Sequence, residues 1–366
     1  MKGAVVTFIA NKRVYYKLRR TAVIKVAIVG AGPTGSYCAY KLAEKDSYPS
    51  IFDYSHPREK PCGGLISGMA QEFFPFLKTL PITHSERSTI NVISPRGRRL
   101  IIRFRKGKII GFSRLNFDQY LLDMAVNEGA DLIEEKVIGL ERKYGWWKVR
   151  TQKQTYAVKT VVGADGVNSM VRRNIIGSLT KRDKGLCFGY FVKGLENEDV
   201  TIKFLPAKKG YTWMIPRGEN TSLGIGSAEI CQHHELKNEL DTFIRNFCPQ
   251  AEKISEWTAL IPNIKDVKTL RTPIAGSNWI LIGDAAGHVD PITGSGIIYA
   301  LLDGELAAKV IVESNPELFN RLWIETYGQT LLRATRLRDW VYKRPVLEFY
   351  CMYLKVQSVT PFAYVG

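Results

Sequence analysis

A glycine-rich turn near the start of the chain has the residue types and spacing that bind a diphosphate. It comprises Gly30, Gly32, Pro33, Thr34 and Gly35, with the glycines in the order G-x-G-x-x-G. In this pattern the first glycine permits a tight turn, the second lets the backbone approach the diphosphate, and the third lets a helix pack closely on a strand. The N-terminus of that helix carries partial positive charge, which attracts the anion. The turn therefore predicts a dinucleotide site.

The elements expected around this turn strengthen the prediction. Residues 23–29 are a β-branched run typical of a buried parallel strand, and residues 36–45 have the pattern of a helix. A short second strand is expected at 50–53, and it ends at Asp53, 23 residues after Gly30. A carboxylate at this place can accept hydrogen bonds from the hydroxyls of a ribose. Sites for FAD and for NAD share these features, so both cofactors stay open at this point.

A second block of residues favours FAD. Asp284 follows a strand expected at 279–283, and a loop then leads to Gly294 and Gly296 at the start of a helix. The Asp284 carboxylate can hold the hydroxyls of a ribityl chain. Backbone N–H groups from Gly294 to Ile297, at the positive end of the helix, can stabilise negative charge on a reduced flavin ring. The alternative is an ordinary connection between a strand and a helix.

A third block, Gly-Ala-Asp-Gly at 163–166, follows another expected strand. The three blocks, in this order, resemble the flavoprotein superfamily of para-hydroxybenzoate hydroxylase. The resemblance implies that Asp165 lies near the FAD. It also implies that Arg114, which precedes a helix expected at 116–129, contacts the cofactor. A surface salt bridge is the alternative role for Arg114.

Two further stretches narrow the resemblance to one family. Residues 60–65 contain Cys62, Gly63 and Gly64, and residues 210–216 read Gly-Tyr-Thr-Trp-Met-Ile-Pro. Together they resemble the geranylgeranyl reductase family, whose pattern is Tyr-x-Trp-x-Phe-Pro; here an isoleucine replaces the phenylalanine. Alternation along a strand would put the aromatic residues on one face, suited to an apolar polyene. A strand face that packs against the protein core is the alternative for Tyr211 and Trp213. The substrate-binding residues implied by the resemblance are Tyr211, Trp213 and Pro216.

The resemblance also implies a place for the Cys62 thiol, beside the flavin ring at the mouth of the substrate slot. Gly63 and Gly64 would give the loop the backbone freedom to approach the ring closely. Cys62 would then either donate the proton that completes alkene reduction or shape the slot as a small apolar group. A buried structural cysteine is the third possibility.

The function implied by this family is an FAD-dependent reductase that saturates C=C bonds of isoprenoid chains on lipids, by hydride transfer from reduced flavin. Because flavin halogenases carry a Trp-x-Trp-x-Ile-Pro element, a flavin-dependent monooxygenase or halogenase acting on an aromatic substrate stays open. A non-catalytic protein that binds flavin and lipid is a third reading. The sequence has no second G-x-G-x-x-G after a strand. The electron donor is therefore left open between a ferredoxin and NAD(P)H.

The composition bears on the partners and on the location of the protein. The 366-residue chain has a formal net charge of +17, which favours anionic partners. It has no nucleic-acid-binding motif, so we expect a prenyl-lipid substrate and no nucleic acid. Basic residues in 95–108 and in 319–358 predict peripheral contact with the cytoplasmic membrane face, although a solvated strand and packed helices explain them equally well. Six scattered cysteines without a C-x-x-C pair predict a cytoplasmic protein with no metal site.

The order of the expected elements predicts an α/β fold. A Rossmann-type FAD-binding domain, a second domain built on an antiparallel β-sheet, and C-terminal helices are expected. The basic residues 1–22 precede the first strand, and we expect this extension to be dispensable. The expected boundaries are 23–88, 110–180 and 275–316 for the discontinuous FAD-binding domain, 89–109 and 181–274 for the antiparallel domain, and 317–366 for the C-terminal segment.

Overall fold

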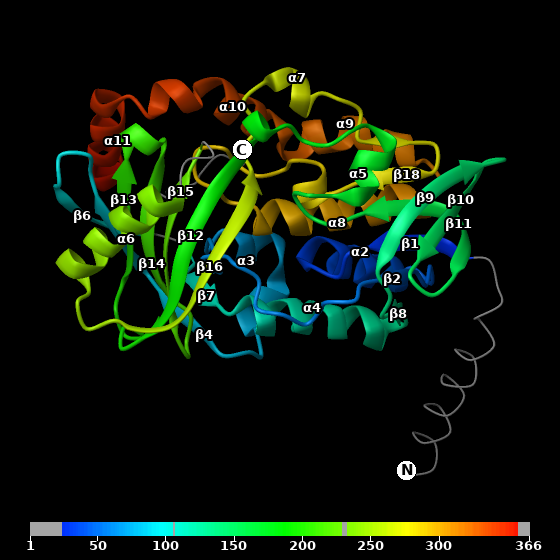
Figure 1. Cartoon of the computed structure of the whole chain (residues 1–366), viewed down its shortest axis with the longest axis horizontal. Helices are drawn as coiled ribbons and strands as arrows, with labels where there is room; N and C mark the ends of the chain where they lie inside the picture. Colours follow the sequence, from blue (N-terminus) through cyan, green and yellow to red (C-terminus); the bar gives the residue numbers. More distant parts are fainter. Residues whose placement is uncertain (1–23, 105–106, 229–232, 358–366) are drawn as a thin grey trace, which may run out of the picture.

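The computed structural model describes residues 24–104, 107–228 and 233–357. The prediction that residues 1–22 are dispensable concerns a segment outside the described residues. Within the described part, the strands form three sheets, and helices pack around them (Figure 1). This α/β arrangement confirms the fold class predicted from the sequence.

The first sheet has the Rossmann arrangement. Strand β1 (Ile24–Val29) lies between β2 (Ser50–Phe52) and β11 (Thr155–Gly163), and it runs parallel to both. The last residues of β1 are β-branched or small and buried, as expected for a central parallel strand. The sheet continues through β8 (Asp131–Ile133), β9 (Val137–Lys143), β10 (Trp146–Thr151), β17 (Ala275–Gly276) and β18 (Trp279–Leu281).

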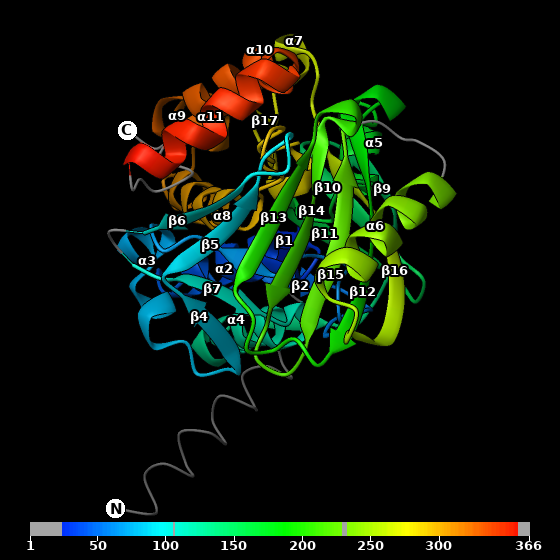
Figure 2. The ribbon, with the colours of Figure 1, turned by 90° about the vertical axis from the view of Figure 1, so that its left-hand side faces the viewer.

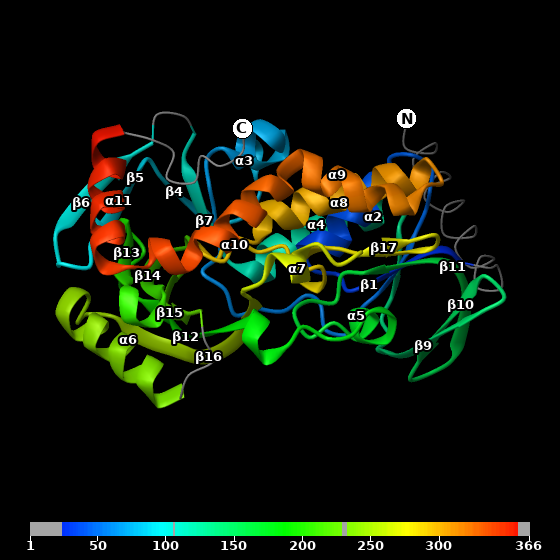
Figure 3. The same cartoon turned by 90° about the horizontal axis from the view of Figure 1, so that it is seen from above.

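Three long helices form a layer against this sheet (Figures 1 and 3). Helix α2 (Pro33–Ala43) packs between α4 (Arg114–Glu128) and α8 (Ile297–Val312). Helix α2 begins three residues earlier than the sequence pattern indicated. Proline suits this first position, since its φ is already helical and a first-turn residue needs no intrahelical N–H partner.

The second sheet carries a hydrophobic cluster on each face. On one face, residues of α6 (His233–Phe247) at helical spacing, Leu236, Leu240 and Phe243, are buried against the strands. On the other face lie the aromatic residues of β14 (Gly210–Pro216), whose alternation confirms that Tyr211, Trp213 and Ile215 share one side. The remaining strands are β5 (Thr89–Ile93), β6 (Arg99–Arg103), β12 (Lys184–Lys193), β13 (Val200–Leu205), β15 (Thr221–Ser227) and β16 (Glu252–Pro262).

The pairing of this sheet departs from the sequence prediction in two respects. The expected hairpin of 89–105 forms as β5 and β6, but β5 joins the sheet by running parallel to β13, so the sheet is mixed. Strand β16 was not expected; it pairs along almost the whole of β12. Its mostly exposed first half has no clear alternation of buried and exposed residues, which explains why the pattern was missed.

The C-terminal segment is helical, as expected, and runs across the top of both sheets (Figures 1 and 2). Helix α11 (Arg344–Gln357) lies against β6. No helix among the described residues has the length and apolar character needed to cross a bilayer. The other elements are β3 (Leu65–Ile66), β4 (His84–Arg87), β7 (Ile109–Phe112), α3 (Ala70–Phe73), α5 (Met170–Ile175), α7 (Val267–Leu270), α9 (Phe319–Trp323), a π-helical turn (Ile324–Gly328) and α10 (Gln329–Val341).

Candidate active site

The glycine-rich turn lies where β1 passes into α2, at the carboxyl end of the parallel strands. Gly30 has φ +107°, and a Cβ there would stand 2.4 Å from the carbonyl oxygen of Ala164. A Cβ on Gly32, by contrast, would meet no described atom within 4 Å. No side chain among the described residues caps the N-terminus of α2, and the first turn of α2 has no acidic residue. An open, positively polarised helix end of this kind fits a diphosphate.

Asp53 lies beside this turn, as the sequence indicated. Its Oδ2 accepts a hydrogen bond from the Ala31 N–H at 2.8 Å, and its Oδ1 accepts one from the Ser55 N–H at 2.7 Å and one from the His56 N–H at 3.1 Å. These donors order the turn and the loop after β2. A ribose hydroxyl would have to share the same carboxylate oxygens, so the role of Asp53 in ribose binding stays a prediction.

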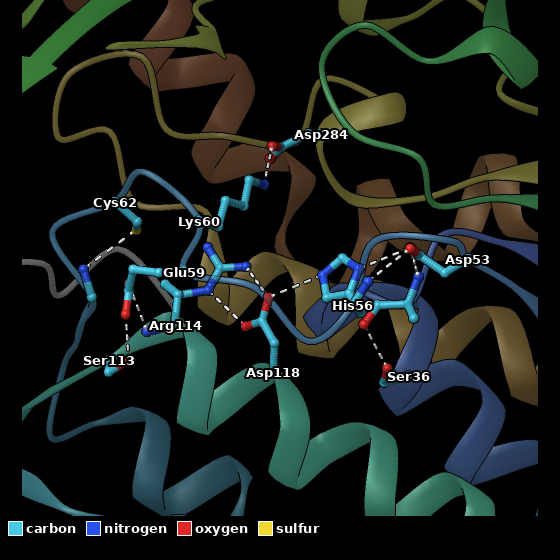
Figure 4. A network of polar contacts seen from close by, with 12 residues as sticks. Ser36, Asp53, His56, Glu59, Lys60, Cys62, Ser113, Arg114, Asp118 and Asp284 are labelled. Atoms are coloured by element: carbon cyan, nitrogen blue, oxygen red, sulfur yellow. Dashed lines mark hydrogen bonds and ion pairs between the residues drawn. The ribbon is translucent and has the colours of Figure 1, made fainter. Parts of the chain in front are cut away.

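A buried chain of charged residues runs from Asp53 towards Cys62 (Figure 4). The His56 ring lies between two carboxylates: its Nδ1 is 2.8 Å from Asp53 and its Nε2 is 3.5 Å from Asp118. Burial alone would lower the pKa of His56, but Asp118 and Asp53 outweigh burial and raise it. Burial would likewise raise the pKa of Asp53, yet the His56 ring and nearby backbone N–H groups hold that pKa below its usual range. The ring is therefore stabilised in its charged form.

Arg114 continues this chain from the first turn of α4. Its guanidinium forms two 2.7 Å hydrogen bonds to Asp118, and it also neighbours the Cys62 thiol. Only 3% of Arg114 is exposed, so the alternative of a surface salt bridge is wrong. The Cys62 sulfur accepts a hydrogen bond from the Gly64 N–H at 3.3 Å. The loop that bears Cys62 and Gly63 is thus held beside a buried cation.

The Asp284 turn approaches the same loop from the other side (Figure 4). The Lys60 ammonium lies 3.4 Å from the Asp284 carboxylate. The N-terminus of α8, at Gly296 and Ile297, has no cap from any side chain that the structure describes, and its first turn has no acidic residue. Gly294, with φ +67°, precedes it. Two uncapped helix ends and a half-exposed carboxylate on one side of the sheet suit the diphosphate, ribityl and ring portions of FAD.

A buried cluster behind this turn was missed by the sequence analysis. Asp303 of α8 accepts a hydrogen bond from the Gly283 N–H at 2.6 Å, next to Asp284. The His288 Nδ1 lies 2.8 Å from the same carboxylate, and the Tyr327 hydroxyl donates to it. Asp303 is fully buried. The cluster fixes the backbone that presents Asp284, and its residues lie too far apart in sequence to form a recognisable motif.

An apolar slot begins at the Cys62 loop and extends over the aromatic face of β14. The Tyr211 hydroxyl donates to the Thr293 carbonyl, which joins the slot to the loop before α8. Trp213 stacks on Trp257 of β16 with 6.0 Å between ring centroids. Trp257 was missed because β16 was not expected. Residues that line the slot include Cys62, Gly63, Cys187, Tyr211, Trp213, Trp257, Ile261, Ile292, Gly294 and Tyr342.

Two predicted site residues have other contacts in the structure. Pro216 ends β14, and its carbonyl accepts a 2.5 Å hydrogen bond from the Ser85 hydroxyl; it is not among the residues that line the slot. The Asp165 carboxylate accepts hydrogen bonds from the Ser169 hydroxyl and the Met170 N–H, so it caps α5. Contact of Pro216 with substrate and of Asp165 with FAD stay predictions.

Comparison with known proteins places this geometry in a family. A scan against protein-family models gives no match. A digeranylgeranylglycerophospholipid reductase of Thermoplasma volcanium is 30% identical over 354 residues, which cover 88% of this chain and 87% of that protein. The chain belongs to the geranylgeranyl reductase family. The present protein is therefore an FAD-dependent oxidoreductase, as its uncapped helix ends and glycine-rich turns indicated.

Solved structures share the fold of the reductase. A geranylgeranyl bacteriochlorophyll reductase-like protein from Thermoplasma acidophilum superposes with a TM-score of 0.81 at 24% identity, over 93% of this chain and 94% of that one. The flavin-dependent brominase Bmp2 superposes with a TM-score of 0.73 at 19% identity, over 94% of both chains. At these identities the likeness concerns the fold alone.

Proposed function

We propose that the reductase saturates C=C bonds of isoprenoid chains carried by lipids, by transfer of hydride from reduced flavin. The observation that carries this proposal is the slot, whose aromatic wall meets the Cys62 loop and the loop before α8. The Thermoplasma volcanium relative is named for a substrate with two geranylgeranyl chains on a glycerophospholipid. An apolar slot lined by Tyr211, Trp213 and Trp257 suits such a chain better than a polar substrate.

The residues of the slot orient the alkene and exclude water. Trp213 and Trp257 are each less than a tenth exposed, and the Trp213 N–H is satisfied by the Ser222 hydroxyl at 3.1 Å. The Trp213 face can therefore contact an unfunctionalised chain without leaving that N–H unpaired. The Trp257 Nε1 has no hydrogen-bond partner among the described residues. Bound FAD, once reduced, supplies the hydride. A chain held in one orientation gains from proximity, which matters because the reacting carbons have no polar group to bind.

The proton that balances the hydride comes, in this proposal, from the Cys62 thiol. Cys187, Tyr211 and Tyr342 of the slot also carry an acidic hydrogen. Burial raises the pKa of Cys187 to about 12. The Tyr211 and Tyr342 hydroxyls, whose pKa values burial also raises, already donate to the carbonyls of Thr293 and Ile292. Cys62 is only half-buried. Arg114 lies beside its sulfur, where the guanidinium can stabilise the thiolate left after the proton reaches the alkene carbon.

The partners of the reductase are part of the proposal. We place it in the cytoplasm, in peripheral contact with the membrane that carries its lipid substrate. The C-terminal helices expose several large apolar side chains: Trp340, Phe349, Met352 and Tyr353. Reduction of the flavin requires a donor, which we propose to be a ferredoxin or NAD(P)H.

One experiment separates this proposal from its alternatives. The purified enzyme is reduced anaerobically with dithionite and mixed with geranylgeranylated glycerophospholipid, and the products are analysed by mass spectrometry. Each saturated bond adds two hydrogens to the lipid, and flavin absorbance should recover in proportion. Hydroxylated or halogenated aromatic products, formed with oxygen, would favour a monooxygenase or halogenase. Flavin that never reoxidises with any prenyl lipid would favour a non-catalytic carrier.

A further inference from the structure

A second pocket lies between α5 and the start of β12, away from the aromatic slot. It has a volume of about 230 Å³, and none of its lining residues lines the slot. Its lining is polar and basic: Arg172 and Arg173 come from α5, Lys184 begins β12, and Asn168 and Ser178 flank them. The pocket therefore gathers three cationic side chains from two separate elements.

Arg172 is buried, and no carboxylate among the described residues forms an ion pair with it. Only 5% of the residue is exposed, and its Nη1 donates to the Ala285 carbonyl at 3.1 Å. Its Nε has no hydrogen-bond partner among the residues described. Burial accordingly lowers the pKa of Arg172, and the charge of Asp183 offsets this only in part.

The nearby carboxylates are already engaged by other groups. Asp183 accepts hydrogen bonds from the Thr180 hydroxyl at 2.6 Å and from the Lys265 N–H at 3.4 Å. Asp165 accepts from the N-terminal residues of α5. A buried cation that lacks a counter-charge is expensive, because desolvation is not offset by an ion pair. The pocket beside Arg172 is consequently the place where an anion would be most stabilised.

We propose that this pocket binds a phosphate group, with Arg172, Arg173 and Lys184 as its cationic contacts. A guanidinium presents donors in a fork that matches phosphate oxygens, and an ammonium adds a third charged donor. The Lys184 ammonium is held 2.8 Å from the Asn168 side-chain oxygen, on the same pocket. Phosphate offers enough acceptor oxygens for all three cations. The group is either a free phosphate ion or part of a larger ligand such as a phosphorylated dinucleotide.

The test uses the FAD-loaded enzyme and isothermal titration with inorganic phosphate and with pyrophosphate. Arg172→Met removes the buried charge at similar length, and Lys184→Gln removes a partly exposed charge with less risk to folding. Arg245→Gln, on the exposed side of α6, is the matched control. We expect each pocket variant to weaken anion binding at least about tenfold, the scale of one lost charged hydrogen bond. The control should bind as the wild type does.

Each outcome of this titration either supports or contradicts a phosphate site in this pocket. Competition between phosphate and NADPH would assign the group to a dinucleotide, and its absence would assign a free ion; both agree with the proposal. Equal binding by Lys184→Gln and wild type, or no binding by the wild-type enzyme, would overturn it. Loss of flavin absorbance in Lys184→Gln would also overturn it, because the pocket would then serve the FAD diphosphate.

Discussion

The Lys60 ammonium lies 3.4 Å from the Asp284 carboxylate, although 224 residues separate them. This contact joins the loop after β2 to the turn before α8. Asp284 is only partly buried, so its free oxygen stays accessible to a cofactor.

Removal of the Asp284 carboxylate should therefore release the flavin. We expect Asp284→Ala to lose most of its FAD after gel filtration, while Asp123→Ala, on the exposed side of α4, keeps it. Loss of hydrogen bonds from ribityl hydroxyls to a charged group should weaken binding by about tenfold or more. The measurement is the ratio of flavin to protein absorbance. Full occupancy in Asp284→Ala would contradict the placement of the ribityl chain.

Asp303 should matter to stability as well as to FAD binding. It is fully buried and accepts hydrogen bonds from Gly283, Tyr327 and His288. Asp303→Ala removes the acceptor of these buried donors, which should lower the free energy of unfolding by about 3 kcal/mol or more. Thermal unfolding with excess FAD measures the loss. Glu317→Ala, at an exposed position, is the control. An unchanged melting temperature would show that the cluster does not hold the turn.

Cys62 variants distinguish a proton donor from a wall of the slot. If the thiol gives the proton, Cys62→Ser and Cys62→Ala should bind FAD normally yet reduce alkene about 100-fold more slowly, the scale expected for a lost general acid. If the thiol only shapes the slot, Cys62→Ala should stay active while the product distribution shifts. Single-turnover reoxidation of prereduced enzyme measures the rate. Cys248→Ala, a buried cysteine packed near α6, is the control. Wild-type behaviour in both Cys62 variants would leave the residue without a role.

The pH dependence of stability follows from the His56 chain. The pKa of His56 is raised in the folded protein. The stability that His56 adds to the folded state is therefore fully present below its unfolded pKa of about 6.5, and it is lost as pH rises through the folded pKa. The pKa values of Asp53 and Asp118 are lowered, so their contribution is present above about 4 and is lost as pH falls.

His56→Gln should consequently destabilise the enzyme more at pH 5.5 than at pH 9. We expect the two losses in melting temperature to differ by about 2 °C or more. The measurement is thermal unfolding of the FAD-loaded enzyme at both pH values. His234→Gln, exposed on α6, corrects for general titration effects. A deficit that grows towards pH 9 would contradict a charged His56.

Binding to anionic liposomes should weaken as salt rises, because the proposed attraction comes from lysine and arginine side chains. Phe349 is 70% exposed and Trp340 is 54% exposed. We expect Phe349→Ser together with Trp340→Ser to reduce sedimentation with vesicles of anionic lipid, while FAD content stays unchanged. Tyr144→Ser, at a 90% exposed turn of the Rossmann sheet, is the control. Binding that does not depend on salt concentration, or no binding at low salt, would contradict the membrane proposal.

Much of the candidate cofactor site could be predicted from the sequence because its signals are local. Gly30 has a positive φ, which favours glycine, and proline suits the first position of α2, so residue types and their order mark the place. Asp53, Asp284 and Gly294 follow by their positions at strand and helix ends. The aromatic face of β14 follows from alternation along one strand. Each of these inferences concerns residues whose geometry is determined within one or two adjoining elements.

Tertiary structure decided the contacts that join these elements. The pairing of His56 with Asp118, of Lys60 with Asp284 and of Asp303 with Gly283 depends on which loops meet at the end of the sheet. Trp257 lies in the slot because β16 pairs with β12. That Arg172 is buried without an ion pair to a described carboxylate can be seen only in the tertiary structure. Burial and charge compensation depend on groups brought together from distant parts of the chain, and no local pattern records them.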